Sequence, residues 1–414
     1  MAYPKLAALS AGMLLAFSAQ AAEVEVLHWW TSGGEAKAAG ELKKTMEGKG
    51  HKWKDFAVAG GGGENAMTAL KTRVVSGNPP AAAQIKGPAI QEWGAEGVLA
   101  SIDDVAKKDK WDTLLPPVVA NVMKYKGQYV AAPVNVHRVN WLWVNPTLLK
   151  KANAKVPGTI DELFVTMEAL KKAGIQPLAY GGQPWQDSTV FESIALGVGG
   201  ADFYQKAFVK LDQATIKSPT MLKALDTYKK LKPYTDKNAP GREWNLATAM
   251  VINGKAAMQF MGDWAKGEFL AAGKVPGKDF LCVAAPGTAK DFTFNIDSFV
   301  FFKQPNKDAV KGQQDLATAL MSPSFQESFN LNKGSIPART GLDMSKFDEC
   351  GKKSSEDFKA AAAGNTLAPS WAHGMAMSSA TQGAMFDVIS QFWNDDKMTA
   401  QQAADKLATA AKTK

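Results

Sequence analysis

Near its amino end the chain reads Val24-Glu25-Val26-Leu27-His28-Trp29-Trp30-Thr31-Ser32-Gly33-Gly34. The alternating residues up to Trp30 predict a β-strand, and the run from Thr31 to Gly34 ends it. Farther along, the sequence predicts a helix over 35–46, a strand over 53–59, a helix over 64–75 that follows four glycines, and a strand over 81–85. Strands that alternate with helices predict an α/β fold, in which a parallel sheet carries helices on both faces.

The ends of these strands are the first place to expect a ligand. Ligands of parallel α/β sheets bind beyond the carboxyl ends of the strands. Trp29 and Trp30 end the first predicted strand, and Gln84 and Lys86 lie at the end of the third. We therefore expect these side chains to lie beside a bound molecule.

The length of the chain predicts two lobes. Its 414 residues exceed the roughly 250–300 residues at which a single hydrophobic core stops growing. Strand-like stretches over 129–145 and 295–302 are candidates for segments that cross between the lobes. Between them, Thr159 and Glu162 have the spacing of a capping box, which indicates a helix start. Two crossings would form a hinge, because a few extended segments can absorb a closing rotation.

Residues 1–21 have the pattern of an export signal. A short segment with one lysine (1–5) precedes an apolar run of small residues (6–19), and Ala19-Gln20-Ala21 forms an A-x-A cleavage site. The pattern predicts a Sec-type signal peptide, so we expect a soluble mature protein in the periplasm. No cysteine follows the apolar run, which argues against a lipid anchor, and no later stretch is long and apolar enough to span a membrane.

Composition and charge are those of an ordinary globular protein. The chain is 46% hydrophobic and 21% charged. Its net charge is +8, which becomes +7 once the single lysine of the signal segment is removed. The lysines are scattered in pairs along predicted helices, as at Lys43-Lys44 and Lys171-Lys172. This spacing indicates a solvated basic face rather than a nucleic-acid-binding surface.

The chain carries two cysteines, Cys282 and Cys350. In an oxidising compartment such a pair more often forms a disulfide than a metal site, and two separate buried thiols are the alternative. The four histidines and two cysteines do not have metal-ligand spacing, so no metal is expected. The sequence also lacks H-E-x-x-H, C-x-x-C, Walker A and G-x-S-x-G motifs, so we expect neither an enzyme nor a cofactor.

Three segments, in order along the chain, resemble family 1 extracellular solute-binding proteins of ABC sugar importers. They are Lys151-Ala-Asn-Ala-Lys-Val-Pro-Gly-Thr-Ile-Asp-Glu-Leu163, then Asn253-Gly-Lys-Ala-Ala-Met258 followed by Gly262-Asp-Trp264, and Gly334-Ser-Ile-Pro-Ala-Arg339. The resemblance implies a periplasmic-binding-protein-like fold of type II, with two α/β lobes, a hinge and a ligand cleft between them. It implies a first lobe of 22–133 with 297–340 and a second lobe of 134–296 with 341–414. It also implies a monomer that passes its ligand to the transmembrane permease subunits of an ABC importer.

Within this family the chain is similar to the glucose-binding branch of Gram-negative bacteria. The similarity lies in residues 28–35 (His-Trp-Trp-Thr-Ser-Gly-Gly-Glu), 84–86 (Gln-Ile-Lys), 295–297 (Asn-Ile-Asp), 331–334 (Leu-Asn-Lys-Gly) and 371–374 (Trp-Ala-His-Gly). It implies that closure of the cleft captures glucose, with galactose and mannose as further candidate hexoses.

A pyranose needs two kinds of contact. Its C–H faces stack on aromatic rings, and each buried hydroxyl needs a hydrogen-bond partner. The expected sugar-binding residues combine the two: Trp29, Trp30, Glu35, Gln84, Lys86, Trp264, Asp297, Lys333 and His373. Tryptophans would stack, carboxylates would accept hydrogen bonds, and the amines would donate them. Each residue also has a structural interpretation, such as a core tryptophan, a first-turn glutamate, a solvated lysine or a carboxylate held in an ion pair.

Two other functions fit parts of the sequence. Glu35 and Asp297 could form the carboxylate pair of a secreted glycoside hydrolase, although the lysines around the expected site argue against it. The charge of +7, together with Lys86, Lys333 and His373, could serve a phosphorylated or acidic sugar. A phosphate site usually adds an arginine fork, and the chain has only four arginines.

Overall fold

The computed structural model describes residues 22–413, so the predicted signal peptide at 1–21 lies outside the described residues. The chain begins with β1 (Glu23–His28), α1 (Gly33–Gly48), β2 (Lys52–Ala57), the single turn η1 (Gly61–Gly63), α2 (Glu64–Val75), β3 (Ala82–Gln84), α3 (Ala89–Ala95), α4 (Asp103–Lys108), α5 (Trp111–Leu114), α6 (Pro117–Val122), β4 (Lys124–Tyr125), β5 (Gln128–Tyr129) and β6 (Ala131–Pro133). It continues with β7 (Asn135–Arg138), β8 (Trp141–Val144), α7 (Pro146–Lys151), α8 (Ile160–Lys172), α9 (Pro184–Tyr204), η2 (Gln205–Val209), α10 (Gln213–Ile216), α11 (Pro219–Lys229), η3 (Lys232–Tyr234), α12 (Trp244–Ile252), β9 (Met258–Phe260), α13 (Ala265–Ala271) and β10 (Leu281–Ala284). The last part contains β11 (Phe292–Asn295), β12 (Ser298–Phe301), α14 (Lys307–Leu320), α15 (Pro323–Lys333), β13 (Ile336–Pro337), α16 (Glu349–Ala363), β14 (Leu367–Pro369), α17 (Ser379–Asn394) and α18 (Ala400–Ala410). No helix within residues 22–413 combines the length and the apolar character needed to cross a membrane.

The first lobe is built on a five-stranded sheet with the order β2-β1-β3-β12-β6. β1 pairs in parallel with β2 and with β3, as the alternation of strands and helices predicts. β12, for whose direction the sequence made no prediction, is antiparallel to β3 and β6. The physical reason is its route: β12 starts beside Gln84, where β3 ends, because its chain returns from the second lobe to that edge of the sheet.

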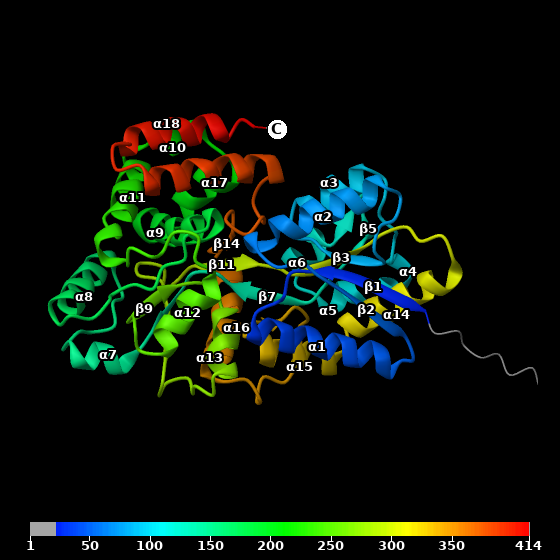
Figure 1. Cartoon of the computed structure of the whole chain (residues 1–414). Helices are drawn as coiled ribbons and strands as arrows, with labels where there is room; N and C mark the ends of the chain where they lie inside the picture. Colours follow the sequence, from blue (N-terminus) through cyan, green and yellow to red (C-terminus); the bar gives the residue numbers. More distant parts are fainter. Residues whose placement is uncertain (1–21, 414) are drawn as a thin grey trace, which may run out of the picture.

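The second lobe contains the three-stranded sheet β10-β8-β9 with helices packed around it. A four-stranded sheet, β13-β7-β11-β14, is here called the junction sheet, and Figure 1 shows β7, β11 and β14 between the lobes. Its buried side chains contribute to two separate hydrophobic cores, since Val136 and Phe294 belong to the first core and Ala368 to the second. Two cores with their own sheets are the two α/β lobes expected from the sequence, while the residue ranges of the lobes stay a prediction.

The segments that cross between the lobes are more broken than the sequence suggests. Residues 129–145 hold the last residue of β5 and three short strands, β6 to β8, of which β7 belongs to the junction sheet. The strand expected over 295–302 is divided into β11 and β12 by Ile296 and Asp297. This division explains how an acid occurs within an apolar run, because Asp297 lies in the two-residue link between β11 and β12 and not inside either strand.

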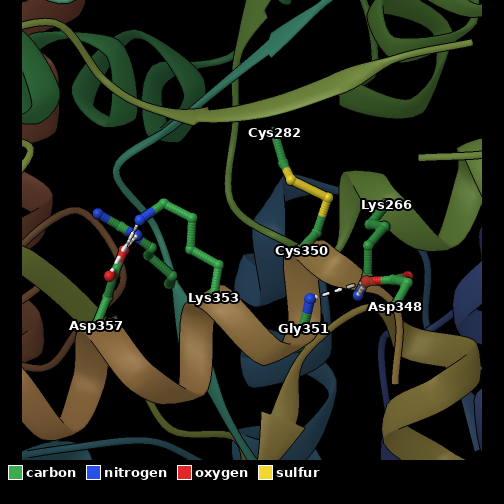
Figure 2. Close-up of a disulfide and its surroundings, with 8 residues drawn as sticks. Lys266, Cys282, Asp348, Cys350, Gly351, Lys353 and Asp357 are labelled. Atoms are coloured by element: carbon green, nitrogen blue, oxygen red, sulfur yellow. Dashed lines mark hydrogen bonds and ion pairs between the residues drawn. A yellow bond between two sulfur atoms is a disulfide. The ribbon is translucent and has the colours of Figure 1, made fainter. Parts of the chain in front are cut away.

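Two local features agree with the sequence. Thr159 Oγ accepts a hydrogen bond from the Glu162 N–H at 3.2 Å, and the Glu162 carboxylate accepts one from the Thr159 N–H at 3.0 Å, which is the capping box of α8. Cys282 on β10 and Cys350 at the start of α16 form a disulfide, with their Cα atoms 6.0 Å apart (Figure 2). Because the far end of α16 packs into the first core through Phe358, this helix is attached to both lobes.

Candidate functional site

A cleft of about 400 Å³ lies between the lobes, at the carboxyl ends of β1 and β3. Its lining comes from both lobes and from the strands between them: Trp29, Trp30, Thr31, Ser32, Glu35, Ala59, Gly60, Gly62, Asn65, Lys86, His137, Trp185, Glu243, Trp244, Asn245, Trp264, Asn295, Asp297, Lys333 and His373. The position agrees with the rule that ligands of α/β sheets bind beyond the carboxyl ends of the strands.

The structure brings eight of the nine expected site residues to this cleft, and Gln84 is the exception. Gln84 is fully buried beneath the cleft. Its Oε1 accepts a hydrogen bond from the Trp29 N–H at 3.3 Å, and its Nε2 donates to Asp297 at 3.2 Å. Gln84 therefore positions two lining residues, because β3 directs its side chain under the loop and not into the opening.

The two adjacent tryptophans have different surroundings. Trp29 is partly exposed, and Lys86 Nζ lies 5.3 Å from the centre of its ring. Trp30 is buried in the first core, where it packs against Phe299 and Phe329. This difference follows from the alternation of side chains at a strand end. Trp29 offers the cleft a ring face, whereas Trp30 forms part of its floor.

Glu35 and Lys333 form an ion pair in the cleft wall. Both side chains are buried, and Ser32 Oγ donates a further hydrogen bond to Glu35 at 3.1 Å. The sequence assigned a sugar hydroxyl to each of these residues separately. In the structure each is the other's ion-pair partner, and both residues line the cleft.

His137, which the sequence reasoning missed, lies between two carboxylates at the base of the cleft. Its Nδ1 contacts Asp263 from the second lobe, and its Nε2 lies 2.8 Å from Asp297 Oδ2. Burial by itself would lower the pKa of His137, but the two carboxylates outweigh burial and raise it. Burial likewise opposes ionisation of Asp297, yet His137 and Lys333 hold the pKa of its carboxyl below the usual range. The imidazole of His137 is therefore held between two buried carboxylates, those of Asp263 and Asp297.

His373 reaches the cleft from the loop before α17. Its Nε2 lies 3.0 Å from Thr189 Oγ, and its ring contacts the rings of Trp185 and Trp264. Burial, followed by the positive charges of Lys86 and His137, lowers the pKa of His373 well below its ordinary value. The imidazole is therefore neutral near pH 7, and a neutral imidazole can accept one hydrogen bond and donate another.

The second lobe supplies most of the aromatic wall. Three of its helices begin at the cleft, and Trp185, Trp244 and Trp264 lie at their first turns. The sequence reasoning found only Trp264 among them. The missed signal was the helix starts Gln183-Pro184-Trp185 and Glu243-Trp244-Asn245, where an aromatic ring is presented next to polar groups. Because tryptophans are usually core residues, the sequence alone did not assign these two to the site.

The arrangement suits a compact molecule with flat apolar faces and a polar rim. Tryptophan faces line several sides, while carboxylates, amides, ammonium groups and a neutral imidazole point between them. The two carboxylates that a glycoside hydrolase would need are occupied by Lys333 and by His137. Because the pKa of Asp297 is lowered, this group is not a proton donor near neutral pH.

Comparison with known proteins agrees with the fold and the position of the cleft. Residues 31–321 match the model of the family described as bacterial extracellular solute-binding protein. The chain is 49% identical over 404 residues to a probable sugar-binding periplasmic protein of Rhizobium meliloti, and the alignment covers 97% of each chain. A probable sugar-binding periplasmic protein of Brucella suis is also 49% identical, over 97% of this chain and 95% of the relative. A glucose-binding protein of Saccharolobus solfataricus is 27% identical over 57% of this chain and 45% of its own length.

Solved structures show the same fold at low sequence identity. A chitin oligosaccharide binding protein superposes with a TM-score of 0.80 at 18% identity and covers 94% of this chain and 98% of its own. The bacterial solute receptor AcbH, described as having an exclusive preference for β-D-galactopyranose, gives the same TM-score, identity and coverage. The matched family model covers more than half of the sequence, and the relatives from Rhizobium and Brucella align over nearly the whole chain. The chain belongs to the family of bacterial extracellular solute-binding proteins.

Proposed function

We propose that this protein is a periplasmic sugar-binding protein that captures glucose and delivers it to the permease subunits of an ABC importer. Galactose and mannose are the further candidate hexoses. Export would depend on the signal peptide predicted at 1–21, and the mature chain would act as a monomer. The proposed lobes are 22–133 with 297–340 and 134–296 with 341–414, with the sugar bound between them.

The observation that carries this proposal is the combination of ring faces and hydroxyl partners in one small cleft. Trp29 from the first lobe and Trp264 from the second supply apolar faces, which suit the C–H surfaces of a pyranose. Asp297 and His373 offer an acceptor and a neutral imidazole to its hydroxyls. A volume of about 400 Å³ lies toward the small end of the roughly 300–1,000 Å³ typical of ligand pockets, which favours one sugar ring.

Closure of the lobes would couple capture to delivery. The lining residues come from both lobes, so only the closed arrangement makes every contact with the sugar. Binding would then shift the population toward the closed state, because that state alone has the higher affinity. The relatives named as sugar-binding periplasmic proteins support this role, and the distant glucose-binding relative supports glucose as the hexose.

Calorimetric titration of sugar-stripped protein tests the proposal. Glucose is expected to bind with a micromolar or lower Kd, whereas maltose and glucose-6-phosphate give no heat. Substitution Lys86→Met should weaken glucose binding roughly 10- to 100-fold, because hydrogen bonds to charged groups contribute about 1.5–3 kcal/mol. The exposed Lys108→Met is the matched control and should leave the Kd unchanged. If another sugar gives heat and glucose gives none, glucose is not the ligand and that other sugar takes its place in the proposal.

A phosphorylated or acidic sugar is the second candidate, and one observation favours it. Lys86 makes no ion pair with any residue in 22–413, and burial lowers the pKa of its ammonium group. An anionic group would supply the missing counter-charge. In that case glucose-6-phosphate should bind more tightly than glucose, and the affinity should fall steeply with added salt. Salt-independent binding would exclude this alternative.

A further inference from the structure

Two glutamates connect the lobes on opposite sides of the junction sheet, and neither of them lines the cleft. Glu268 on α13 of the second lobe reaches the start of α1 in the first lobe, and Glu92 on α3 of the first lobe reaches the start of α17 in the second. Figure 1 shows α1 with α13 on one side of β7 and β11, and α17 on the other side. The two contacts are therefore reciprocal and lie on both flanks of the cleft.

Glu268 takes the place of a missing cap on α1. The residue before this helix, Ser32, makes no capping hydrogen bond with its side chain, and it donates to Glu35 instead. Glu268 Oε1 accepts a hydrogen bond from the Gly34 N–H at 2.8 Å. A carboxylate at a helix N-terminus satisfies an orphan N–H and interacts favourably with the helix dipole. Here that carboxylate comes from the other lobe.

Glu92 of the first lobe makes the corresponding contact with α17 of the second lobe. Its two carboxylate oxygens accept hydrogen bonds from the N–H and the hydroxyl of Ser379, each at 2.8 Å. Ser378 caps the same helix from within its own lobe by accepting from the Thr381 N–H at 3.2 Å. Glu92 therefore adds a second, negatively charged cap to a helix end that is already formed.

Close backbone contacts accompany both glutamates. A Cβ atom on Gly34 would lie 2.6 Å from the backbone carbon of Gly267, and a Cβ atom on Gly87 would lie 2.1 Å from the carbonyl oxygen of Gly374. These four glycines bring the two lobes together without side chains between them. An opening rotation would break both the backbone contacts and the two glutamate contacts.

We propose that Glu92 and Glu268 are positioning residues that hold the closed arrangement of the lobes by capping helices of the opposite lobe. They set the affinity for the sugar and its release rate without contacting it. This inference rests on the proposed function for its role in transport, but the interlobe contact itself can be tested without any sugar.

Cysteine cross-linking provides the sugar-free test. The double variant Glu92→Cys/Ser379→Cys places two thiols at one contact, so they join only when the lobes are closed. Adding Glu268→Ala on the opposite flank is expected to slow cross-linking roughly two- to fivefold, because a charge at an exposed helix end contributes about 0.3–1 kcal/mol. The matched control adds Glu96→Ala, because Glu96 is an exposed glutamate one turn after Glu92 whose carboxylate accepts no hydrogen bond from any residue in 22–413. An equal rate in all three proteins, or no cross-link at all, would overturn the proposal.

Glucose titration provides the second readout. The single variants Glu92→Ala and Glu268→Ala should each raise the Kd roughly two- to fivefold through faster dissociation. The melting temperature of the sugar-free, open protein should stay unchanged in both variants. If either glutamate had a purely structural role within its lobe, its removal would lower that melting temperature. An unchanged Kd for both variants would overturn the proposal. Failure of the unsubstituted protein to bind any sugar would instead contradict the proposed function, and the cross-linking rates would still decide this inference.

Discussion

The buried ion pair between Glu35 and Lys333 allows a quantitative prediction. The two side chains are 9% and 3% exposed, so each charge depends on the other for its compensation. Substitution Lys333→Met keeps the length of the side chain and removes the charge, which leaves the Glu35 carboxylate buried without its partner. Breaking a buried pair in this way costs about 3–5 kcal/mol. We expect the free energy of unfolding of the sugar-free protein to fall by that amount.

Removing both charges should have a much smaller effect. In the double variant Glu35→Gln/Lys333→Met no unpaired charge remains, and replacement of a whole buried pair by uncharged groups is often neutral. The double variant should therefore recover most of the stability that the single variant loses. This recovery is the sign of an interaction between the two sites, which a double-mutant cycle isolates.

Urea unfolding at pH 7, followed by tryptophan fluorescence in the absence of sugar, measures these free energies. The exposed pair Lys346–Glu327 is the matched control, with side chains 65% and 28% exposed. Lys346→Met should cost less than about 1 kcal/mol, as surface ion pairs do. The reasoning would be refuted if Lys333→Met cost no more than Lys346→Met. It would also be refuted if the double variant lost as much stability as the single variants Glu35→Gln and Lys333→Met lose together.

Three further predictions concern pH, covalent structure and closure. Because two carboxylates raise the pKa of His137, its protonation stabilises the fold below the ordinary histidine pKa of about 6.5, and this stabilisation is lost as the pH rises through the raised value. Between pH 6 and 9 the urea midpoint of the unsubstituted protein should fall as the pH rises, whereas the midpoint of His137→Gln should not show this fall. Equal pH dependence of the two midpoints would contradict the prediction. Cys282→Ser/Cys350→Ser should destabilise the chain by about 4 kcal/mol in the loop-entropy model for the observed sequence separation of 68 residues, which thermal unfolding with and without reductant can check. Gly34→Ala should prevent full closure, because its Cβ would lie 2.6 Å from the backbone of α13, whereas Gly40→Ala in the same helix has free space around it. Small-angle scattering with saturating sugar should then show compaction for Gly40→Ala only, and equal compaction of both variants would speak against this account.

Local patterns in the sequence predicted much of the first lobe and one helix start in the second. The strand before Trp29, the helix that begins at Glu64 and the capping box at Thr159 are formed as expected. These features depend on residues within a few positions of each other, through side-chain alternation, glycine turns and caps. The direction of β12 could not be obtained in this way, because it depends on the route by which the chain returns from the other lobe.

The sequence by itself identified eight of the groups that line the cleft, because tryptophans, carboxylates and lysines at strand and helix ends could be recognised from their positions. Only the tertiary structure decided which groups neutralise each other. Glu35 and Lys333 are 298 residues apart, and His137 joins Asp263 and Asp297 across 126 and 160 residues. Charge compensation acts over a few ångströms in space and is independent of distance along the chain, so no local pattern can reveal it. The same holds for the caps supplied by Glu92 and Glu268, whose helices belong to the opposite lobe.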